Sequence, residues 1–287
     1  MKPWISLALA ASVLTGSAAT VKVGPGERFA KPSQAAAAVR DGDVVEITAG
    51  TYAGDVCRWA ANRLDIRGAG PKSSILDAAG RSCQGKGTWI VAGSDIRISG
   101  LAFRNATCKD RNGAGIRMEG GNLAVSNCLF EANENGILTG ALPESELRVT
   151  DSVFRGNGAG DGYSHNIYVG KIRLFEFRNC TSDHAKVGHN LKSRALKSVV
   201  TECVFDDADD GRSSYLANFP NGGDVTLANC RFVQSPVANN STMVSVGEEG
   251  PYPGSTFSER GNSFSSRRHA STTLRLAPGI SRPAALK

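Results

Sequence analysis

Four cysteines occupy the same place in four copies of one short pattern, and this repeat constrains the fold more than any other feature. Each copy alternates apolar and polar residues up to the cysteine. The copies span residues 123–130, 175–181, 199–205 and 225–232, with Cys128, Cys180, Cys203 and Cys230. A fifth copy at 147–154 has Ser152 in the cysteine position, and matching apolar residues lie 23 to 28 residues apart. A repeat of this length without a helical period predicts a β-solenoid.

The segment before these repeats differs in composition. Ser33 is expected to cap a short helix of strong helix formers at 33–40, and this helix is expected to end at residues 41–43. A strand follows at 44–47. Because an open solenoid end exposes core and unpaired backbone, we expect residues 20–53 to form a cap. The solenoid is then expected at 54–265, and residues 266–287, rich in Ser, Pro and Arg, are expected to form a loosely ordered tail.

Several segments resemble the pectate-lyase-like superfamily. The resemblance rests on the runs 34–52, 64–70 and 96–103 and extends to about Phe232. It implies an all-β fold, a single-stranded right-handed parallel β-helix (β-solenoid) with a short N-terminal capping helix. The superfamily is dominated by lyases, hydrolases and epimerases that act on uronic-acid polymers, so the resemblance is more specific for fold than for activity.

The N-terminus has the pattern of an export signal. Residues 1–19 contain Lys2, an apolar run to Leu14 and small residues before Ala19, which predicts a cleaved signal peptide; an uncleaved anchor is the alternative. We therefore expect a secreted or periplasmic protein with no membrane span, and a monomer. The net charge of +6, without long basic runs, favours an acidic polysaccharide as partner rather than nucleic acid.

The seven cysteines do not indicate a metal site, because no CxxC or paired-histidine spacing occurs. The four repeat cysteines are interpreted as inward-facing core residues. Cys57, Cys83 and Cys108 lie outside the repeat, and a Cys57–Cys83 disulfide is the preferred pairing. No cofactor is expected. The acidic run with Asp206, Asp207, Asp209 and Asp210 is interpreted as a solvated turn, with calcium binding as the alternative.

A second strand also repeats in every coil. Its aliphatic column is expected to face inward: Ile116, Ile137, Ile167, Leu191 and Leu216. Because strand side chains alternate, the columns on both sides are expected to face outward. One is Gly115, Gly136, Asn166, Asn190 and Tyr215. The other is Arg117, Leu138, Tyr168, Lys192 and Ala217.

Two polar segments, 162–170 and 188–194, lie one coil apart, so Tyr168 is expected beside Lys192 and His165 beside His189. The candidate catalytic residues are Lys192, Arg194, His189, Tyr168 and His165. The candidate substrate-binding residues are Asn166, Asn190, Tyr215, Asn218 and Arg117. Strict alternation points both histidines inward, so a structural role is their alternative. A hydrogen-bonded ladder is the alternative for the two asparagines.

The same block resembles a group of exported bacterial β-helix proteins. The matching parts are a His-Asn-φ-Tyr-Val segment at 165–169, a Gly-His-x-x-Lys-Ser-Arg-Ala segment at 188–195, and Ser214-Tyr215 followed by Pro-Asn-Gly-Gly at 220–223. This resemblance implies export and the β-helix fold without assigning a reaction.

These residue types favour β-elimination from a uronate-containing polysaccharide. That reaction needs cations to neutralise the carboxylate, a base for the C5 proton and an acid for the leaving oxygen. Lys192 and Arg194 supply charge, with Lys192 as base and Tyr168 or His189 as acid. The alternatives are a non-catalytic glycan-binding or cell-envelope/exopolysaccharide assembly module, a C5-epimerase, or a glycoside hydrolase. A hydrolase is disfavoured because 188–189 precedes the acidic run, the reverse of the order in β-helix hydrolases.

Overall fold

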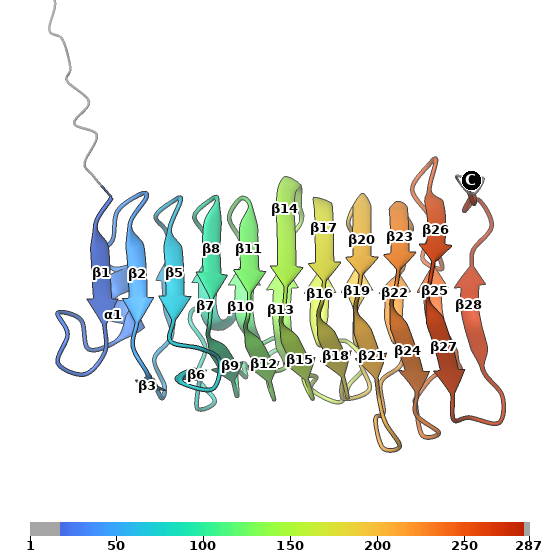
Figure 1. The fold of residues 1–287 in the computed structure, drawn as a ribbon, viewed down its shortest axis with the longest axis horizontal. Helices are drawn as coiled ribbons and strands as arrows, with labels where there is room; N and C mark the ends of the chain where they lie inside the picture. Colours follow the sequence, from blue (N-terminus) through green and yellow to red (C-terminus); the bar gives the residue numbers. More distant parts are fainter. Residues whose placement is uncertain (1–17, 284–287) are drawn as a thin grey trace, which may run out of the picture.

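The computed structural model describes residues 18–283, and it contains one parallel β-solenoid of three sheets (Figure 1). Each coil contributes one strand to each sheet in turn, and every strand pairs in parallel with its counterpart in the next coil. The predicted all-β right-handed parallel β-helix is confirmed. Apart from Ala18 and Ala19, the predicted signal peptide lies outside the described residues.

The three sheets run side by side along the long axis of the molecule (Figure 1). Sheet A consists of β1 (Thr20–Val23), β2 (Val44–Ile47), β5 (Asp65–Gly68), β8 (Ile96–Ser99), β11 (Leu123–Ser126), β14 (Leu142–Thr150), β17 (Ile172–Arg178), β20 (Lys197–Thr201), β23 (Asp224–Ala228) and β26 (Thr256–Arg260). Sheet B consists of β3 (Gly50–Thr51), β6 (Ser74–Asp77), β9 (Ala102–Arg104), β12 (Leu129–Glu131), β15 (Val153–Arg155), β18 (Thr181–Asp183), β21 (Val204–Asp206), β24 (Arg231–Gln234) and β27 (Ser263–Ser266). Sheet C consists of β4 (Cys57–Trp59), β7 (Gly87–Val91), β10 (Ala114–Met118), β13 (Asn135–Thr139), β16 (Ile167–Val169), β19 (Lys192–Ser193), β22 (Ala217–Phe219), β25 (Thr242–Val246) and β28 (Thr272–Leu276).

The cysteine repeat spans a strand of sheet A, a sharp turn and the following strand of sheet B. The residue before each cysteine adopts a left-handed backbone, with φ of 48° at Asn127, 51° at Asn179 and 55° at Asn229. Asparagine tolerates this conformation better than most residues, which explains its recurrence there. The register is as predicted, because Val125 pairs with Val149 and Phe177 with Val200.

The repeat cysteines are buried, as predicted, and none forms a disulfide. Cys180 donates its thiol hydrogen to the carbonyl oxygen of Arg178 at 3.2 Å. Ser152 donates in the same way to Thr150 at 2.7 Å, which explains why serine can replace cysteine in the ladder. All seven cysteines are free, so the Cys57–Cys83 disulfide is not formed.

Stacked aromatic rings fill the core beside the cysteines. Phe103, Phe130 and Phe154 are stacked with ring centroids 5.1 and 4.6 Å apart. Phe205, Phe232 and Phe264 continue the same pattern at 4.9 Å. These distances match the roughly 4.8 Å spacing of neighbouring strands, so one ring from each coil packs against the next.

The two ends differ in detail from expectation. The helix is only α1 (Pro32–Ala36), and Lys31 rather than Ser33 is its N-cap, because Pro32 takes the first helical position. Ser33 instead donates its hydroxyl hydrogen to Asp55 at 2.5 Å. At the other end, β28 pairs in parallel with β25, so the segment expected to be loosely ordered contributes a strand to the last coil.

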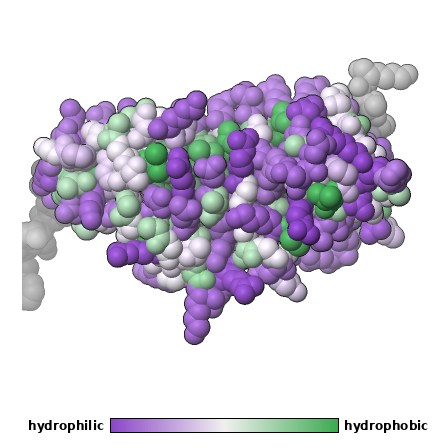
Figure 2. Space-filling view, turned by 90° about the horizontal axis from the view of Figure 1, so that it is seen from below, coloured by the Kyte–Doolittle hydropathy of each residue, from purple (hydrophilic) through white to green (hydrophobic). Residues whose placement is uncertain are grey.

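The face of the solenoid drawn in Figure 2 is mainly polar. Figure 2 shows a hydrophilic face with small separate hydrophobic spots. Among the described residues, no helix is long and apolar enough to cross a bilayer.

Candidate functional site

Tyr168 of β16 and Lys192 of β19 are direct neighbours on the outer face of sheet C, as predicted. The ammonium group of Lys192 lies 5.3 Å from the centroid of the Tyr168 ring. This is a cation–π distance, and it holds the amine close to the phenol.

Arg194 joins this pair from the residues just after β19. Its Nε–H donates to the Tyr168 hydroxyl oxygen at 3.1 Å, and one terminal nitrogen donates to Asn221 Oδ1 at 2.6 Å. The carbonyl oxygen of Arg194 accepts a hydrogen bond from the Tyr252 hydroxyl at 3.0 Å. The structure points the Arg194 side chain toward the outer face of sheet C.

Glu249 is part of the same cluster, and the sequence did not predict it. Its carboxylate lies 2.7 Å from the Arg194 guanidinium and 3.6 Å from the Lys192 ammonium. Burial works to raise the pKa of the Glu249 carboxyl, but the Arg194 hydrogen bond and the two charges outweigh it and lower that pKa. The loop after β25 carries this residue. The only signal for it was an acidic pair between Gly247 and Gly250.

His165 and His189 are buried and stacked on each other, with ring centroids 4.5 Å apart. His165 Nδ1 accepts the backbone N–H of His189 at 2.9 Å, and His189 Nδ1 accepts that of Tyr215 at 3.4 Å. These bonds assign the hydrogen of each neutral ring to Nε2. Their burial and these backbone contacts favour the structural role.

Burial also determines the charge state of both imidazoles. Burial lowers the pKa of His189 to about 3, with a further contribution from Lys192 and then Arg194. Burial also lowers the pKa of His165 well below its usual value, helped by His189 and Lys192. Both rings are therefore neutral near pH 7. They support the site by packing edge-on against Tyr168 and Tyr215 at 5.1 and 5.0 Å.

The predicted outward direction of Asn166 and Asn190 is wrong, because both side chains are fully buried. They belong to a ladder in which each carboxamide donates to the next member: Asn133 to Asn157 at 3.0 Å, Asn157 to Asn166 at 2.9 Å, Asn166 to Asn190 at 3.0 Å and Asn190 to Asp207 at 2.8 Å. The chain turns from sheet B to sheet C here, so strand alternation does not hold. A Cβ atom at Gly115 would meet the Phe130 ring at 3.0 Å, which shows that this column also faces the core.

The remaining candidate residues lie at different distances from Tyr168, Lys192 and Arg194. Asn218, rather than the predicted Ala217, pairs with Lys192, because one extra residue enters the coil after Leu216. Asn218 is buried and donates to the Glu248 carboxylate. Tyr215 is half-buried beside His189. Arg117 lies in the Tyr168 column two strands away, with Leu138 between them.

The acidic run does not form one ligand cluster. Asp206 pairs with Arg231, Asp209 with Arg267 and Asp210 with His184, whereas Asp207 accepts from Asn190 and Ser213. Within residues 18–283, no group of three or more His, Cys, Asp or Glu side chains is arranged to hold a metal ion. The structure therefore does not bring the four carboxylates together around a calcium position.

Comparison with solved structures supports the fold. The chain is similar to pectin methylesterase from carrot (TM-score 0.62, 12% identity, 96% of this chain and 91% of that one) and to pectate lyase Pel9A (0.59, 14%, 92% and 78%). It is also similar to alginate lyase from Paenibacillus sp. str. FPU-7 (0.52, 14%, 92% and 99%). No protein-family model and no curated protein sequence matches the chain. The chain therefore shares the parallel β-helix fold of these structures.

Proposed function

We propose that this protein is an exported polysaccharide lyase that cleaves a uronate-containing polymer by β-elimination on the outer face of sheet C. The observation that carries the proposal is the convergence of a phenol, an amine and a guanidinium: Tyr168 contacts both Lys192 and Arg194. The lyases among the structural neighbours support this reaction class.

The three groups match the three requirements of the reaction. Arg194 binds the substrate carboxylate, because a guanidinium pairs with a carboxylate through two parallel hydrogen bonds. Lys192, in its amine form, removes the C5 proton. Tyr168 donates its hydroxyl proton to the glycosidic oxygen as the C4–O bond breaks and the C4–C5 double bond forms. The hydroxyl oxygen of Tyr168 already accepts from Arg194, so its own hydrogen remains available for donation.

Glu249 occupies the position that this mechanism assigns to the substrate carboxylate. Its side chain is 46% exposed, so it can turn into solvent without moving the backbone. An incoming uronate replaces one carboxylate by another at Arg194, so the charge of the guanidinium stays compensated throughout.

The test is incubation of the mature protein with polygalacturonate and with alginate, followed by the ultraviolet absorbance of the unsaturated product. Activity that is lost in Lys192→Ala and Tyr168→Phe supports the proposal. Lys197→Ala is the matched control, because Lys197 is an exposed lysine that pairs with Asp224 in sheet A. Absence of the chromophore on every uronate polymer, with folded protein, would overturn it.

Two alternatives rest on specific observations. Glu248 and Glu249 bring two carboxylates to this face, which favours hydrolysis or ester cleavage, and several structural neighbours are pectin methylesterases. New reducing ends or released methanol without the chromophore would identify those reactions. Arg194 is held by three partners, which favours a non-catalytic glycan-binding module; retention on a glycan gel without any product would identify that.

A further inference from the structure

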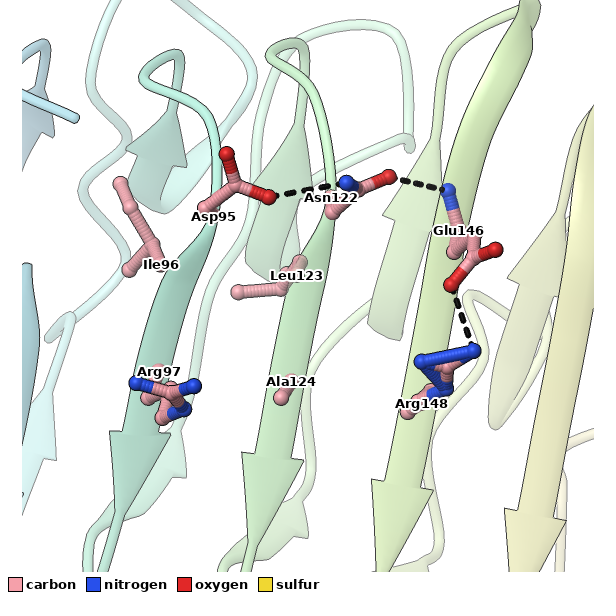
Figure 3. Close-up of a pocket in the computed structure, with 8 residues that line it drawn as sticks. All are labelled: Asp95, Ile96, Arg97, Asn122, Leu123, Ala124, Glu146 and Arg148. Atoms are coloured by element: carbon pink, nitrogen blue, oxygen red, sulfur yellow. Dashed lines mark hydrogen bonds and ion pairs between the residues drawn. The ribbon is translucent and has the colours of Figure 1, made fainter. Parts of the chain in front are cut away.

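A hollow on sheet A lies on a different face of the solenoid from the candidate site. Strands β8, β11 and β14 form it, and Figure 3 shows the side chains that line it. The residues that line it are Asp95, Ile96, Arg97, Asn122, Leu123, Ala124, Glu146 and Arg148.

The hollow exists because of one small residue. Ala124 stands in register between Arg97 and Arg148, one on each neighbouring strand. The two arginines are thus about two strand spacings apart, roughly 9.6 Å between backbones. A methyl group between two long side chains leaves a space open to solvent that suits a single sugar ring.

The rim on one side is already ordered by hydrogen bonds. Asn122 donates to Asp95 at 2.8 Å and accepts the backbone N–H of Glu146 at 3.0 Å (Figure 3). Arg148 pairs with Glu146 at 2.6 Å and with Glu176 at 2.7 Å. Carboxylates, a carboxamide and a guanidinium fixed in this way are the groups that bind sugar hydroxyls with little loss of side-chain entropy.

Arg97 on the other side has a free guanidinium. Its neighbour in the same column is Asp65, but Asp65 is paired with Arg67 at 2.5 Å. Within residues 18–283, the Arg97 side chain is exposed and forms neither an ion pair nor a hydrogen bond. An unpaired guanidinium at the edge of a sugar-sized hollow is suited to a carboxylate, which it binds through two hydrogen bonds.

We propose that this hollow is a second, non-catalytic saccharide-binding site, in which Arg97 binds the carboxylate of one uronate residue and the ordered rim binds its hydroxyls. The choice of a uronate rests on the proposed substrate class of the sheet C site. Because the two sites lie on different faces, the hollow would hold the polymer near the enzyme without taking part in bond cleavage.

The test is affinity electrophoresis in gels that contain polygalacturonate or alginate, in a Tyr168→Phe background that removes turnover. Arg97→Gln is expected to weaken retention about tenfold, the effect of one charge-assisted contact. Ala124→Leu, which fills the hollow without changing charge, is expected to weaken it similarly. Arg178→Gln is the matched control, because Arg178 is an exposed arginine of sheet A outside the hollow, and it is expected to leave retention nearly unchanged.

Equal losses in Arg97→Gln and Arg178→Gln would overturn the inference, because they would show a general charge effect. Retention unchanged in Ala124→Leu would also overturn it. Turnover of short soluble oligouronates tests the proposed function separately. Arg97→Gln in the wild-type background is expected to leave that turnover unchanged. Absence of turnover in the wild type would mean that the proposed function has failed, whereas unchanged gel retention in Arg97→Gln would mean that the second site has failed.

Discussion

The guanidinium of Arg194 donates its Nε–H to the Tyr168 hydroxyl at 3.1 Å, although 26 residues separate the two in sequence. The same guanidinium contacts Glu249 and Asn221, so a single side chain connects sheet C to two loops. The orientation of the phenol therefore depends on the planar, forked geometry of arginine.

Arg194→Lys is expected to lower kcat/KM on a uronate polymer at least tenfold, although the charge is kept. Lysine cannot reach Tyr168, Asn221 and a carboxylate at once with fixed geometry. Initial rates measured by the unsaturated-product absorbance check this. Near wild-type rates would show that charge alone is needed at this position. The thermal unfolding of the same variant controls for loss of folding.

Glu249→Gln is expected to tighten binding of uronate oligosaccharides several-fold, because it removes the carboxylate that competes for Arg194 and Lys192. A partly exposed ion pair contributes only about 0.2–1 kcal/mol, so the effect should stay below about tenfold. Titration calorimetry measures it, with Glu144→Gln as the exposed acidic control. Weaker binding, or kcat falling by orders of magnitude, would instead make Glu249 a catalytic group.

His189→Gln is expected to flatten the pH dependence of stability between about pH 6 and pH 4. The unfolded imidazole binds a proton below its usual pKa of 6.5, whereas the folded one does so only near 3. Stability is therefore fully present above pH 6.5 and is lost as pH falls through this window, by about 1.4 kcal/mol per pH unit for one histidine. Urea unfolding at several pH values measures the slope.

The control for this slope is His269→Gln, because His269 is exposed. His184 acts in the opposite direction: burial opposes its protonation, but Asp183 and Asp210 outweigh burial and raise its pKa. The comparison must therefore be between variants at each pH. Identical slopes in wild type and His189→Gln would show that the buried pair does not titrate as the structure requires.

Asn190→Ala is expected to destabilise the protein by about 2–4 kcal/mol. The change removes the acceptor for Asn166 and the donor to Asp207, and it leaves buried polar groups without partners. Asn239→Ala, at an exposed position, should cost less than about 0.5 kcal/mol. Chemical denaturation measures both, and similar values for the two variants would contradict the ladder.

Cys180→Ser is expected to be tolerated with a loss below about 1.5 kcal/mol, because Ser152 already makes the equivalent backbone hydrogen bond. Burial raises the pKa of Cys128 to about 12, so that thiol stays protonated and unreactive. Alkylation of the native protein followed by mass spectrometry should modify Cys83 and Cys108, which are partly exposed, before Cys128. Faster labelling of Cys128 would contradict its burial.

The repeat alone was sufficient to place the strands of sheet A and to set Tyr168 beside Lys192. Coil-to-coil register depends on a short pattern of apolar residues and a left-handed turn residue, and both are local in sequence. For the same reason the inward cysteines were predictable. The direction of Asn166 and Asn190 was not, because alternation applies within a strand and fails where the chain turns between sheets.

What the sequence by itself determined is therefore the solenoid, its register and the residues that meet on neighbouring coils. Only the tertiary structure decided which loop lies against the neighbouring residues of sheet C. Glu249 lies 57 residues after Lys192, and its contact depends on the path of a loop that no periodic pattern describes. The unpaired guanidinium of Arg97 likewise depends on the ion pair between Asp65 and Arg67. Side-chain packing selects that partner for Asp65, and residue spacing does not.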